Sequence, residues 1–200
     1  MKIEKINPFQ QVALVRNVAL AYQQAFGNNP WNEGYKCPIC ATTTPLTAGE
    51  AICPSCSERG LKILMIEYWP LSKIISDFYQ EMKKPNSLCL IVREADKVIG
   101  FTWGYQINID QEIDNYLEAP GLSEVAQGNF FYADEAAILP GYQGRGIGKK
   151  MVTQFFTGQP QKRVLLRTLN GSPMFNLIKQ LGGETILNIS RQRVIMTIAL

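Results

Sequence analysis

Four of the five cysteines fall in two turns of the same pattern, Cys37-Pro-Ile-Cys40 and Cys53-Pro-Ser-Cys56. A Cys-Pro-x-Cys turn directs two sulfur atoms and nearby backbone N–H groups at one position, and two such turns provide the four thiolates of a structural zinc site. The spacing therefore predicts Zn²⁺ bound by these four cysteines. A four-cysteine site has no open position for substrate, so we expect the metal to be structural rather than catalytic.

Two other interpretations of the cysteines stay open. Iron in a rubredoxin-like cage would use the same sulfurs, and two disulfides would suit an extracellular module. The first residues, Met1–Asn7, lack the apolar block of a secretory signal, which disfavours the disulfides. Residues 35–60 are too few for a hydrophobic core, so metal binding and local folding should be one event. Cys89 lies in a β-rich stretch and is expected to be an inert core residue.

The second stretch that could do chemistry is the glycine loop, Gln143-Gly-Arg-Gly-Ile-Gly148. It follows an apolar run that ends at Pro140-Gly141, and helical spacing resumes at Lys149. A strand, a glycine turn and a helix N-terminus together present backbone N–H groups to an anion. Glycine also permits a positive φ and the close approach of a phosphate. We expect a phosphate-bearing cofactor at this loop.

Composition limits the remaining chemistry. The chain has no histidine, which excludes catalysis by imidazole, so a general base must be a carboxylate, a lysine, a tyrosine or a relayed water. The net charge is only +3, but residues 106–140 carry seven acidic and no basic side chains, whereas residues 141–200 carry nine basic and one acidic. The basic segment suits a polyanionic cofactor. The acidic segment suits a cationic substrate or is simply a solvated surface.

The elements that must position these residues follow from apolar periodicity. We expect helices at 7–27, 70–82, 149–157 and 173–181, a short helix at 111–117, and strands at 87–94, 97–108, 129–139, 163–168, 184–189 and 194–200. Gly100 and Gly104, inside one predicted strand, indicate a bulge or the close approach of another group. At 200 residues, of which 46% are hydrophobic, the chain suits one packed domain.

This element order places the glycine loop where antiparallel strands give way to a strand–helix–strand unit. With Gln143, Gly146 and Gly148 in the loop, the chain resembles the GNAT superfamily of acyl-CoA-dependent N-acyltransferases, whose hallmark is a (Gln/Arg)-x-x-Gly-x-(Gly/Ala) loop after the fourth strand. The resemblance implies an α/β (α+β) fold, with a central mixed, mainly antiparallel sheet flanked by helices. It would form a single domain over 1–200 with a zinc-ribbon-like module inserted at 35–60. The alternative is a glycine turn of purely structural use.

The resemblance also implies which residues hold acetyl-CoA. Backbone N–H groups of the loop would bind the coenzyme A pyrophosphate, helped by the dipole of the following helix. Backbone groups before the loop would orient the pantetheine arm and polarise the thioester carbonyl, and an asparagine after the next strand would contact the coenzyme. These cofactor-binding residues are Ile138, Leu139, Gln143, Gly144, Arg145, Gly146, Ile147, Gly148, Lys149 and Asn170.

The implied reaction is direct attack of an amine on a thioester, which requires a base for the amine proton. Glu135 lies where several family members keep a carboxylate, and it is the predicted base, directly or through water; its alternative role is to orient the substrate cation. Strand alternation predicts that Asp134 points to the opposite face. The tyrosine acid of many members falls at Ile178, so the acid stays open between Ser172, Tyr142 and unaided departure of the thiolate.

We therefore expect an N-acetyltransferase that moves an acetyl group from acetyl-CoA to a primary amine of a cationic small molecule or peptide. The alternatives are a zinc-ribbon adaptor and an acyl-CoA sensor, each with a catalytically degenerate body. Nucleic acid is not an expected partner, because residues 35–60 have two basic and two acidic side chains. No apolar run reaches membrane-spanning length, so we expect a cytoplasmic protein without a membrane partner. The sequence leaves the oligomeric state open, and a homodimer is one of the alternatives.

Overall fold

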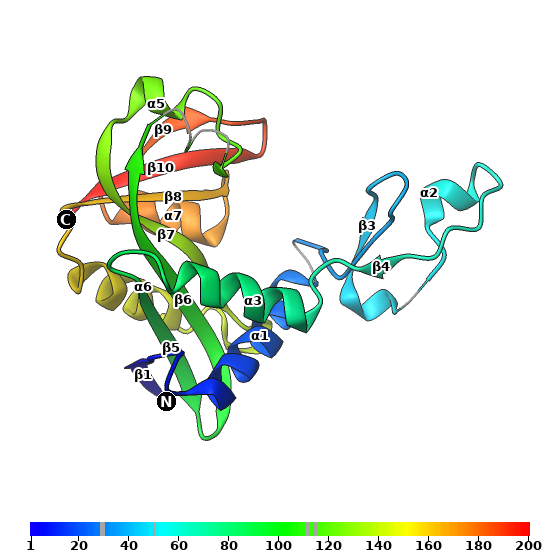
Figure 1. Ribbon diagram of the computed structural model, residues 1–200, viewed down its shortest axis with the longest axis horizontal. Coiled ribbons are helices and arrows are strands. Elements are labelled where there is room, and N and C mark those ends of the chain that lie inside the picture. The colour runs from blue at the N-terminus through cyan, green and yellow to red at the C-terminus, as the bar shows by residue number, and fades with distance from the viewer. Residues whose placement is uncertain (29–30, 50, 111–112, 114–115) are drawn as a thin grey trace.

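The computed structural model describes residues 1–28, 31–49, 51–110, 113 and 116–200. Its body is a seven-stranded sheet in the order β1-β5-β6-β7-β8-β10-β9 (Figure 1). All neighbours in this sheet are antiparallel except β7 and β8, which are parallel. The predicted mixed, mainly antiparallel sheet is therefore confirmed. The strands are β1 (Lys2–Lys5), β5 (Leu88–Glu94), β6 (Lys97–Ile109), β7 (Gly128–Ile138), β8 (Arg163–Leu169), β9 (Glu184–Asn188) and β10 (Arg193–Ala199).

Helices cover both faces of this sheet because its strands are apolar on both faces. Phe101 of β6 packs with α1 (Val12–Phe26) and α3 (Leu71–Glu81), whereas Ile99 of the same strand packs with α6 (Ile147–Thr157) and α7 (Pro173–Gln180). In a regular strand Ile99 and Phe101 would lie on the same face. The register of β5 and β6 shifts beside Ile99, however, and this irregularity places the two side chains on opposite faces. A short helix, α5 (Leu122–Val125), covers the end of the sheet beside β9.

The first helix starts later than its sequence pattern predicts. Asn7 closes a turn in which its Oδ1 accepts a hydrogen bond from Phe9 N at 3.1 Å, and the helix begins only at Val12. Phe9 and Val12 are therefore exposed, and the buried stripe starts at Val15. The helix predicted at 111–117 lies largely outside the described residues. In the described part of the chain, no helix has the length and apolar character needed to cross a bilayer.

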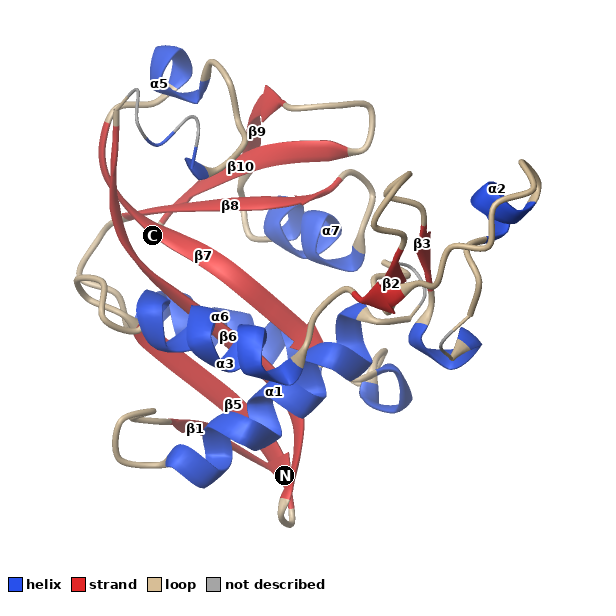
Figure 2. Ribbon diagram, turned by 45° about the vertical axis from the view of Figure 1, so that its right-hand side comes forward, coloured by secondary structure: helices blue, strands red, loops and turns tan. Residues whose placement is uncertain are grey.

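The strands β7 and β8 diverge, and this divergence creates the main cavity. Their parallel pairing covers only Phe131–Ala133 against Val164–Leu166. Beyond that point β7 continues to Ile138 and β8 to Leu169 without pairing to each other, and Figure 2 shows the two strands spreading apart. A sheet edge left open in its interior exposes backbone N–H and C=O groups that a ligand can pair with.

A second, three-stranded sheet lies apart from the body, to the right in Figure 1. It is built from β2 (Tyr35–Lys36), β3 (Thr43–Thr44) and β4 (Ile66–Glu67), with the short helices η1 (Leu46–Ala48) and α2 (Pro54–Ser57) in its connections. Its last strand, β4, lies after residue 60, so the small sheet extends beyond the module expected at 35–60. Gly34 is required where this sheet joins the body, since a Cβ there would lie 2.1 Å from Leu46 N.

Candidate active site and cysteine cluster

A cavity of about 550 Å³ lies where β7 and β8 diverge. Its walls come from the open ends of these two strands, from the loop before α6 and from one side of α7. The α7 residues that line it are Pro173, Met174, Leu177 and Gln180, so this wall is mainly apolar. The cavity can therefore bind an apolar group against α7. It can also bind polar atoms through the unpaired backbone groups of β7 and β8.

The glycine loop forms one end of this cavity. Gly144 and Gly146 have φ of +75° and +73°, values at which an L side chain is strained, and this explains the two glycines. In the described structure, the N–H groups of residues 144–149 donate to no backbone or side-chain acceptor. The last of them open the first turn of α6, where the helix dipole is positive. The loop thus presents a set of aligned donors suited to a phosphate.

The structure brings seven of the ten predicted cofactor residues to the cavity wall: Ile138, Gln143, Gly144, Gly146, Ile147, Gly148 and Lys149. The other three do not line it. Leu139 is buried and its N–H donates to Ile99 O at 2.9 Å, while the Arg145 guanidinium donates to Gly141 O at 2.9 Å. Asn170 is exposed in the turn after β8, where its N–H donates to Gln192 O.

A second cavity, of about 310 Å³, meets the first at the diverging strands. The two cavities share seven lining residues: Phe26, Trp31, Asp134, Glu135, Arg167, Thr168 and Leu169. The second cavity is lined by aromatic rings and charged groups: Tyr22, Phe26, Trp31, Glu33, Tyr68, Trp69, Tyr116, Glu118, Tyr132, Arg167 and Arg193. Glu135 therefore lies where a ligand in one cavity would meet a ligand in the other.

A bulge in β7 corrects the predicted direction of Asp134. Trp103 pairs with Glu135 and Gly104 pairs with Ala133, so Asp134 is the extra residue. Alternation predicted that Asp134 would point away from Glu135, but both side chains now lie on the α1/α3 side, where their charges act on one another and on Glu81. Gly104 permits the bulge, because a Cβ there would lie 2.1 Å from Tyr132 O. The predicted irregularity at Gly104 is confirmed.

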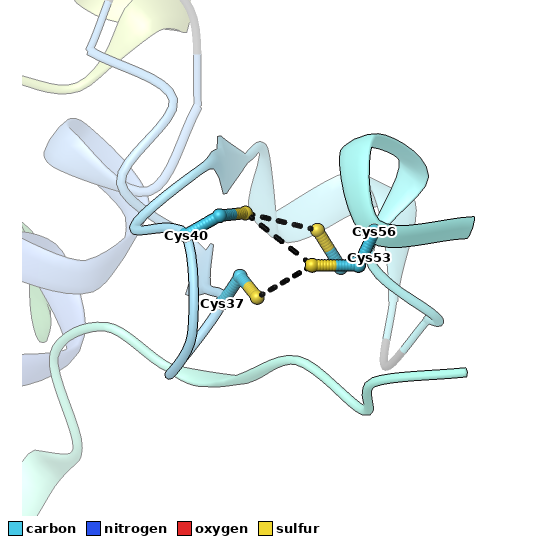
Figure 3. A group of neighbouring side chains, drawn as sticks. All are labelled: Cys37, Cys40, Cys53 and Cys56. Carbon is cyan, nitrogen blue, oxygen red and sulfur yellow. Dashed lines mark hydrogen bonds between the residues drawn. The ribbon is translucent and has the colours of Figure 1, made fainter. Parts of the chain in front are cut away.

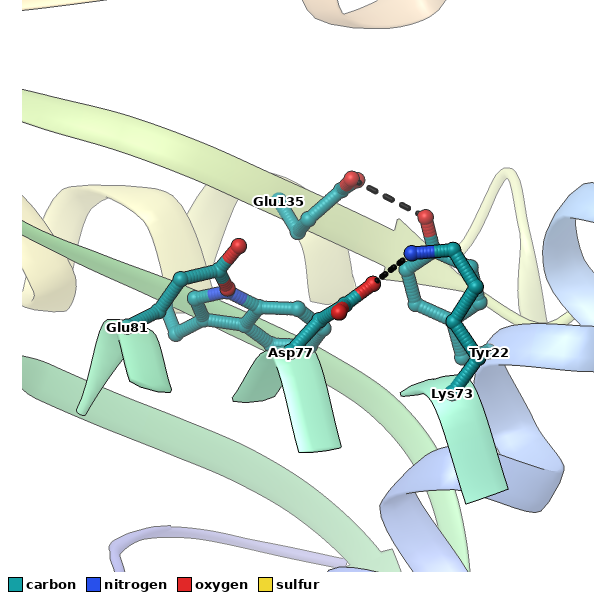
Figure 4. A network of polar contacts seen from close by, with 6 residues as sticks. Tyr22, Lys73, Asp77, Glu81 and Glu135 are labelled. Atoms are coloured by element: carbon teal, nitrogen blue, oxygen red, sulfur yellow. Dashed lines mark hydrogen bonds and ion pairs between the residues drawn. The ribbon is translucent and has the colours of Figure 1, made fainter. Parts of the chain in front are cut away.

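Three carboxyl groups thus gather beside the junction of the cavities. The Tyr22 hydroxyl donates to Glu135 Oε1 at 3.0 Å, and Trp103 Nε1 donates to Glu81 Oε2 at 2.7 Å. Figure 4 shows Glu81 on α3 directed toward β7, and Glu135 directed toward Tyr22. Burial and the neighbouring Asp134 and Glu81 carboxylates raise the pKa of Glu135 well above its usual range. A carboxyl group with a raised pKa is a stronger base once ionised.

Glu81 makes the stability of the protein dependent on pH. Burial and the adjacent Asp134 charge raise the pKa of Glu81 from 4.5 to about 8. The folded state therefore keeps a proton that the unfolded chain releases, so the free energy of unfolding falls as pH rises from about 4.5 to about 8. In Glu81→Gln this contribution is absent. We expect the variant to gain stability over the wild type as pH rises from 5 to 8, measured by urea unfolding. Glu184→Gln, at an exposed site, is the control; a pH-independent difference for Glu81→Gln would contradict the prediction.

The residues considered for the acid are now placed. Ser172 caps α7, where its Oγ accepts a hydrogen bond from Phe175 N at 3.1 Å and lies 3.0 Å from Thr168 Oγ1, beside the main cavity. The Tyr142 hydroxyl donates to Glu94 Oε2 at 3.0 Å. Ile178 is fully buried and packs in the apolar core of the α6/α7 face. Of the two candidate hydroxyl groups, that of Ser172 lies next to a second hydroxyl, Thr168 Oγ1, at the end of β8.

The four cysteines gather in the small sheet, and all their sulfur atoms lie within 4.8 Å of one another. The Sγ–Sγ distances are 3.8 Å for Cys37–Cys56, 3.5 Å for Cys40–Cys53 and 3.6 Å for Cys40–Cys56 (Figure 3). Four sulfurs held tetrahedrally at about 2.3 Å from one Zn²⁺ would lie about 3.8 Å apart, so the cluster fits that ion. Ile39 N donates to Cys37 Sγ at 3.4 Å, as expected of a turn that supports a thiolate. Cys89 is buried in the body, as predicted.

Sequence reasoning missed several side chains at the junction. Tyr22, Glu81, Glu33 and Trp69 come from helices and loops far from β7 in the chain, and none of them belongs to a recognisable motif. The acidic charge of residues 106–140 pointed to Asp134 and Glu135. The carboxylates of Glu33 and Glu81 come from other segments of the chain. Proximity in the fold, not spacing in the chain, assembles this group.

The chain resembles known proteins in its sequence and in its fold. Residues 58–157 match the family described as the Acetyltransferase (GNAT) family. Similar solved structures include PH1933 from Pyrococcus horikoshii OT3, with a TM-score of 0.56 and 15% identity over 100% of this chain and 98% of that one. Arylalkylamine N-acetyltransferase 2 from Aedes aegypti gives a TM-score of 0.60 and 11% identity over 99% and 98%. At these identities the structural likeness shows the fold. A search of curated proteins found no match.

Proposed function

This chain belongs to the acetyltransferase (GNAT) family and is an acyltransferase, and from that premise we propose that it moves an acetyl group from acetyl-CoA to a primary amine of a cationic acceptor. The family uses acetyl-CoA and acts on amine acceptors. The single observation that supports the finer proposal is the meeting of two cavities at Glu135: one ends in the glycine loop, and the other is lined by aromatic rings, four carboxylates and two arginines.

In this proposal the larger cavity holds acetyl-CoA. The N–H groups of Gly144–Lys149 bind the pyrophosphate, and Gln143 keeps the loop in place through its side chain, whose Nε2 donates to Ile138 O at 2.8 Å. The open edge of β7 near Ile138 orients the pantetheine arm and the thioester carbonyl. Leu139, Arg145 and Asn170 then act on the cofactor only through the residues beside them, because they do not line the cavity.

The smaller cavity holds the amine. Glu135 accepts the amine proton as the nitrogen forms its bond to the thioester carbonyl carbon; the carbon–sulfur bond then breaks and the thiolate leaves. Tyr22 holds Glu135 in position through the 3.0 Å hydrogen bond. The Ser172 and Thr168 hydroxyls, 3.0 Å apart at the end of β8, are the groups we propose to supply a proton to the departing sulfur.

We propose that Cys37, Cys40, Cys53 and Cys56 bind one structural Zn²⁺. The sulfur–sulfur distances support a tetrahedral ion, and among the described residues the apolar cluster around them contains, besides the cysteines, only Tyr35, Met65 and the partly buried Leu46 and Ile63. Such a cluster is too small to fold alone, so the metal supplies the stability of this segment. We retain a single GNAT-like domain over 1–200 with the zinc-ribbon-like module at 35–60, a cytoplasmic location, and a small-molecule or peptide amine as the partner.

Binding of acetyl-CoA tests the cofactor site. Isothermal titration calorimetry should show acetyl-CoA binding to the wild type, weakened at least about tenfold in Gly146→Val, because a branched residue cannot keep φ near +73° and aim the loop N–H groups. The matched control is Gly141→Val, since Gly141 has no positive φ and open space for a Cβ. Equal binding by both variants and the wild type would contradict the assignment of the loop.

Turnover separates the remaining alternatives. Thiol release from acetyl-CoA across a panel of primary amines distinguishes an enzyme from an acyl-CoA sensor, which would bind without release. A zinc-ribbon adaptor on a degenerate body would not bind acetyl-CoA at all. Family membership favours the enzyme.

A further inference from the structure

The ends of the cysteine segment form one wall of the smaller cavity. Trp31 and Glu33 lie just before β2, and Tyr68 and Trp69 lie just after β4. All four are half-buried and line the cavity that meets the larger one at Glu135. The chain thus leaves the body for the cysteine cluster, and returns from it, through the site that receives the amine.

Short contacts hold this wall together as one unit. The indole Nε1 of Trp69 donates to Glu33 Oε2 at 2.9 Å, and Tyr68 N donates to Gly34 O at 3.0 Å, so the outgoing and returning segments are joined directly. The body holds the wall from the other side: Gln23 Nε2 donates to Trp69 O at 2.7 Å, and the Tyr22 and Trp69 rings meet edge to face at 5.8 Å. Tyr22 also donates to Glu135, which connects the wall to the proposed base.

Besides Asp134 and Glu135, the smaller cavity is lined by two carboxylates, Glu33 and Glu118, and by two arginines, Arg167 and Arg193. Glu118 is paired with Arg167, whose Nη1 lies 3.4 Å from its Oε2. Glu33, among the described residues, has no basic partner; its hydrogen bond comes from the neutral Trp69 indole. A carboxylate beside the face of an aromatic ring is a favourable environment for an ammonium group. Trp69 already has the Lys73 ammonium 5.5 Å from its ring centroid.

We propose that Glu33 and Trp69 bind a second cationic group of the acceptor, so that the enzyme selects diamines and other dicationic amines over monoamines. The inference rests on the proposed function, because Glu135 marks where the reacting amine lies. The second ammonium then occupies the wall that the cysteine segment supplies, while the first is deprotonated at Glu135. Glu33 and Trp69 are specificity determinants in this view and take no part in the chemical step.

The test compares 1,4-diaminobutane with 1-aminobutane, which differ only in the second ammonium group. We expect the wild type to bind the diamine about tenfold more tightly in calorimetry, as a charged hydrogen bond to one extra ammonium implies. Glu33→Gln should abolish that preference, raise KM for the diamine about tenfold with little change in kcat, and leave the monoamine unaffected. Gln keeps an oxygen to accept from Trp69 Nε1, so the wall should stay folded.

The control variant is Glu67→Gln, which removes an exposed carboxylate of β4 outside the cavity and should preserve the preference. The inference is overturned if the wild type does not prefer the diamine, or if Glu33→Gln changes both amines equally. Since calorimetry needs no turnover, discrimination in binding without acetyl transfer would refute the proposed reaction and leave the role of Glu33 supported.

Discussion

Replacing Glu135 with Gln should lower kcat about 10²- to 10⁴-fold, the range by which a positioned general base accelerates a reaction. Gln keeps the oxygen that accepts from the Tyr22 hydroxyl, so packing and substrate placement should be preserved. Burial and the neighbouring carboxylates raise the pKa of Glu135 well above its usual range, and the base must be ionised to act, so the wild-type kcat/KM should rise with pH as the group ionises. Steady-state kinetics at saturating acetyl-CoA, with thiol release as the signal, measure both effects.

A matched control uses another carboxylate on the same side of the sheet. Asp77 is half-buried on α3 and pairs with Lys73 Nζ at 2.6 Å (Figure 4). It lines neither cavity. Asp77→Asn should leave kcat unchanged. Removing the charge of Glu81 should lower the pKa of Glu135 and move the acid limb of the pH profile to lower pH. Turnover of Glu135→Gln within twofold of the wild type would eliminate Glu135 as the base.

Loss of the metal should have the largest structural effect. The wild type should contain about one zinc per chain, as one four-cysteine site requires. Cys53→Ser removes a fully buried ligand and should abolish zinc binding and unfold the cysteine segment, because the binding free energy of structural zinc, about 10–16 kcal/mol, is also the folding free energy of such a module. Hydrogen exchange should show lost protection at Cys37 N, Cys53 N and Met65 N, which donate to backbone carbonyls of that segment.

The body should survive this change. Amides of the β5–β6 and β6–β7 ladders do not depend on the cluster and should stay protected. Cys89→Ser is the control, since Cys89 is equally buried but lies in β5, away from the other four, so the variant should keep its zinc. A wild-type protein that is free of metal and still protected throughout residues 35–67 would contradict the zinc site.

The contrast between these two predictions reflects how each group of residues is specified. The cysteine cluster was predictable because each pair lies in one tight turn, whose local geometry fixes the direction of both sulfurs. The glycine loop was predictable for a similar reason: positive φ at Gly144 and Gly146 is a local requirement that glycine meets. The element order around the loop then sufficed to predict the mixed sheet. The exception among the helices is α1, which starts later than predicted.

The surroundings of Glu135 were not predictable in this way. Simple alternation put Asp134 on the wrong face, because the bulge depends on the pairing of β7 with β6 and on the room that Gly104 leaves. Tyr22 and Glu81 contribute to the site through helices that dock on the sheet, and their contacts carry no mark in the local sequence. Burial of three carboxyl groups together, which raises their pKa values, exists only once these elements have packed.

By itself the sequence determined the chemistry that short spacing can encode: a four-sulfur metal site, a loop of backbone donors for an anion, and the exclusion of imidazole catalysis. The tertiary structure alone decided where the cavities meet, which carboxylates raise the pKa of Glu135, and that both ends of the cysteine segment line the smaller cavity. The physical reason is range. Turn geometry acts over a few residues, whereas desolvation and charge–charge interactions act between groups that only folding brings within a few ångströms.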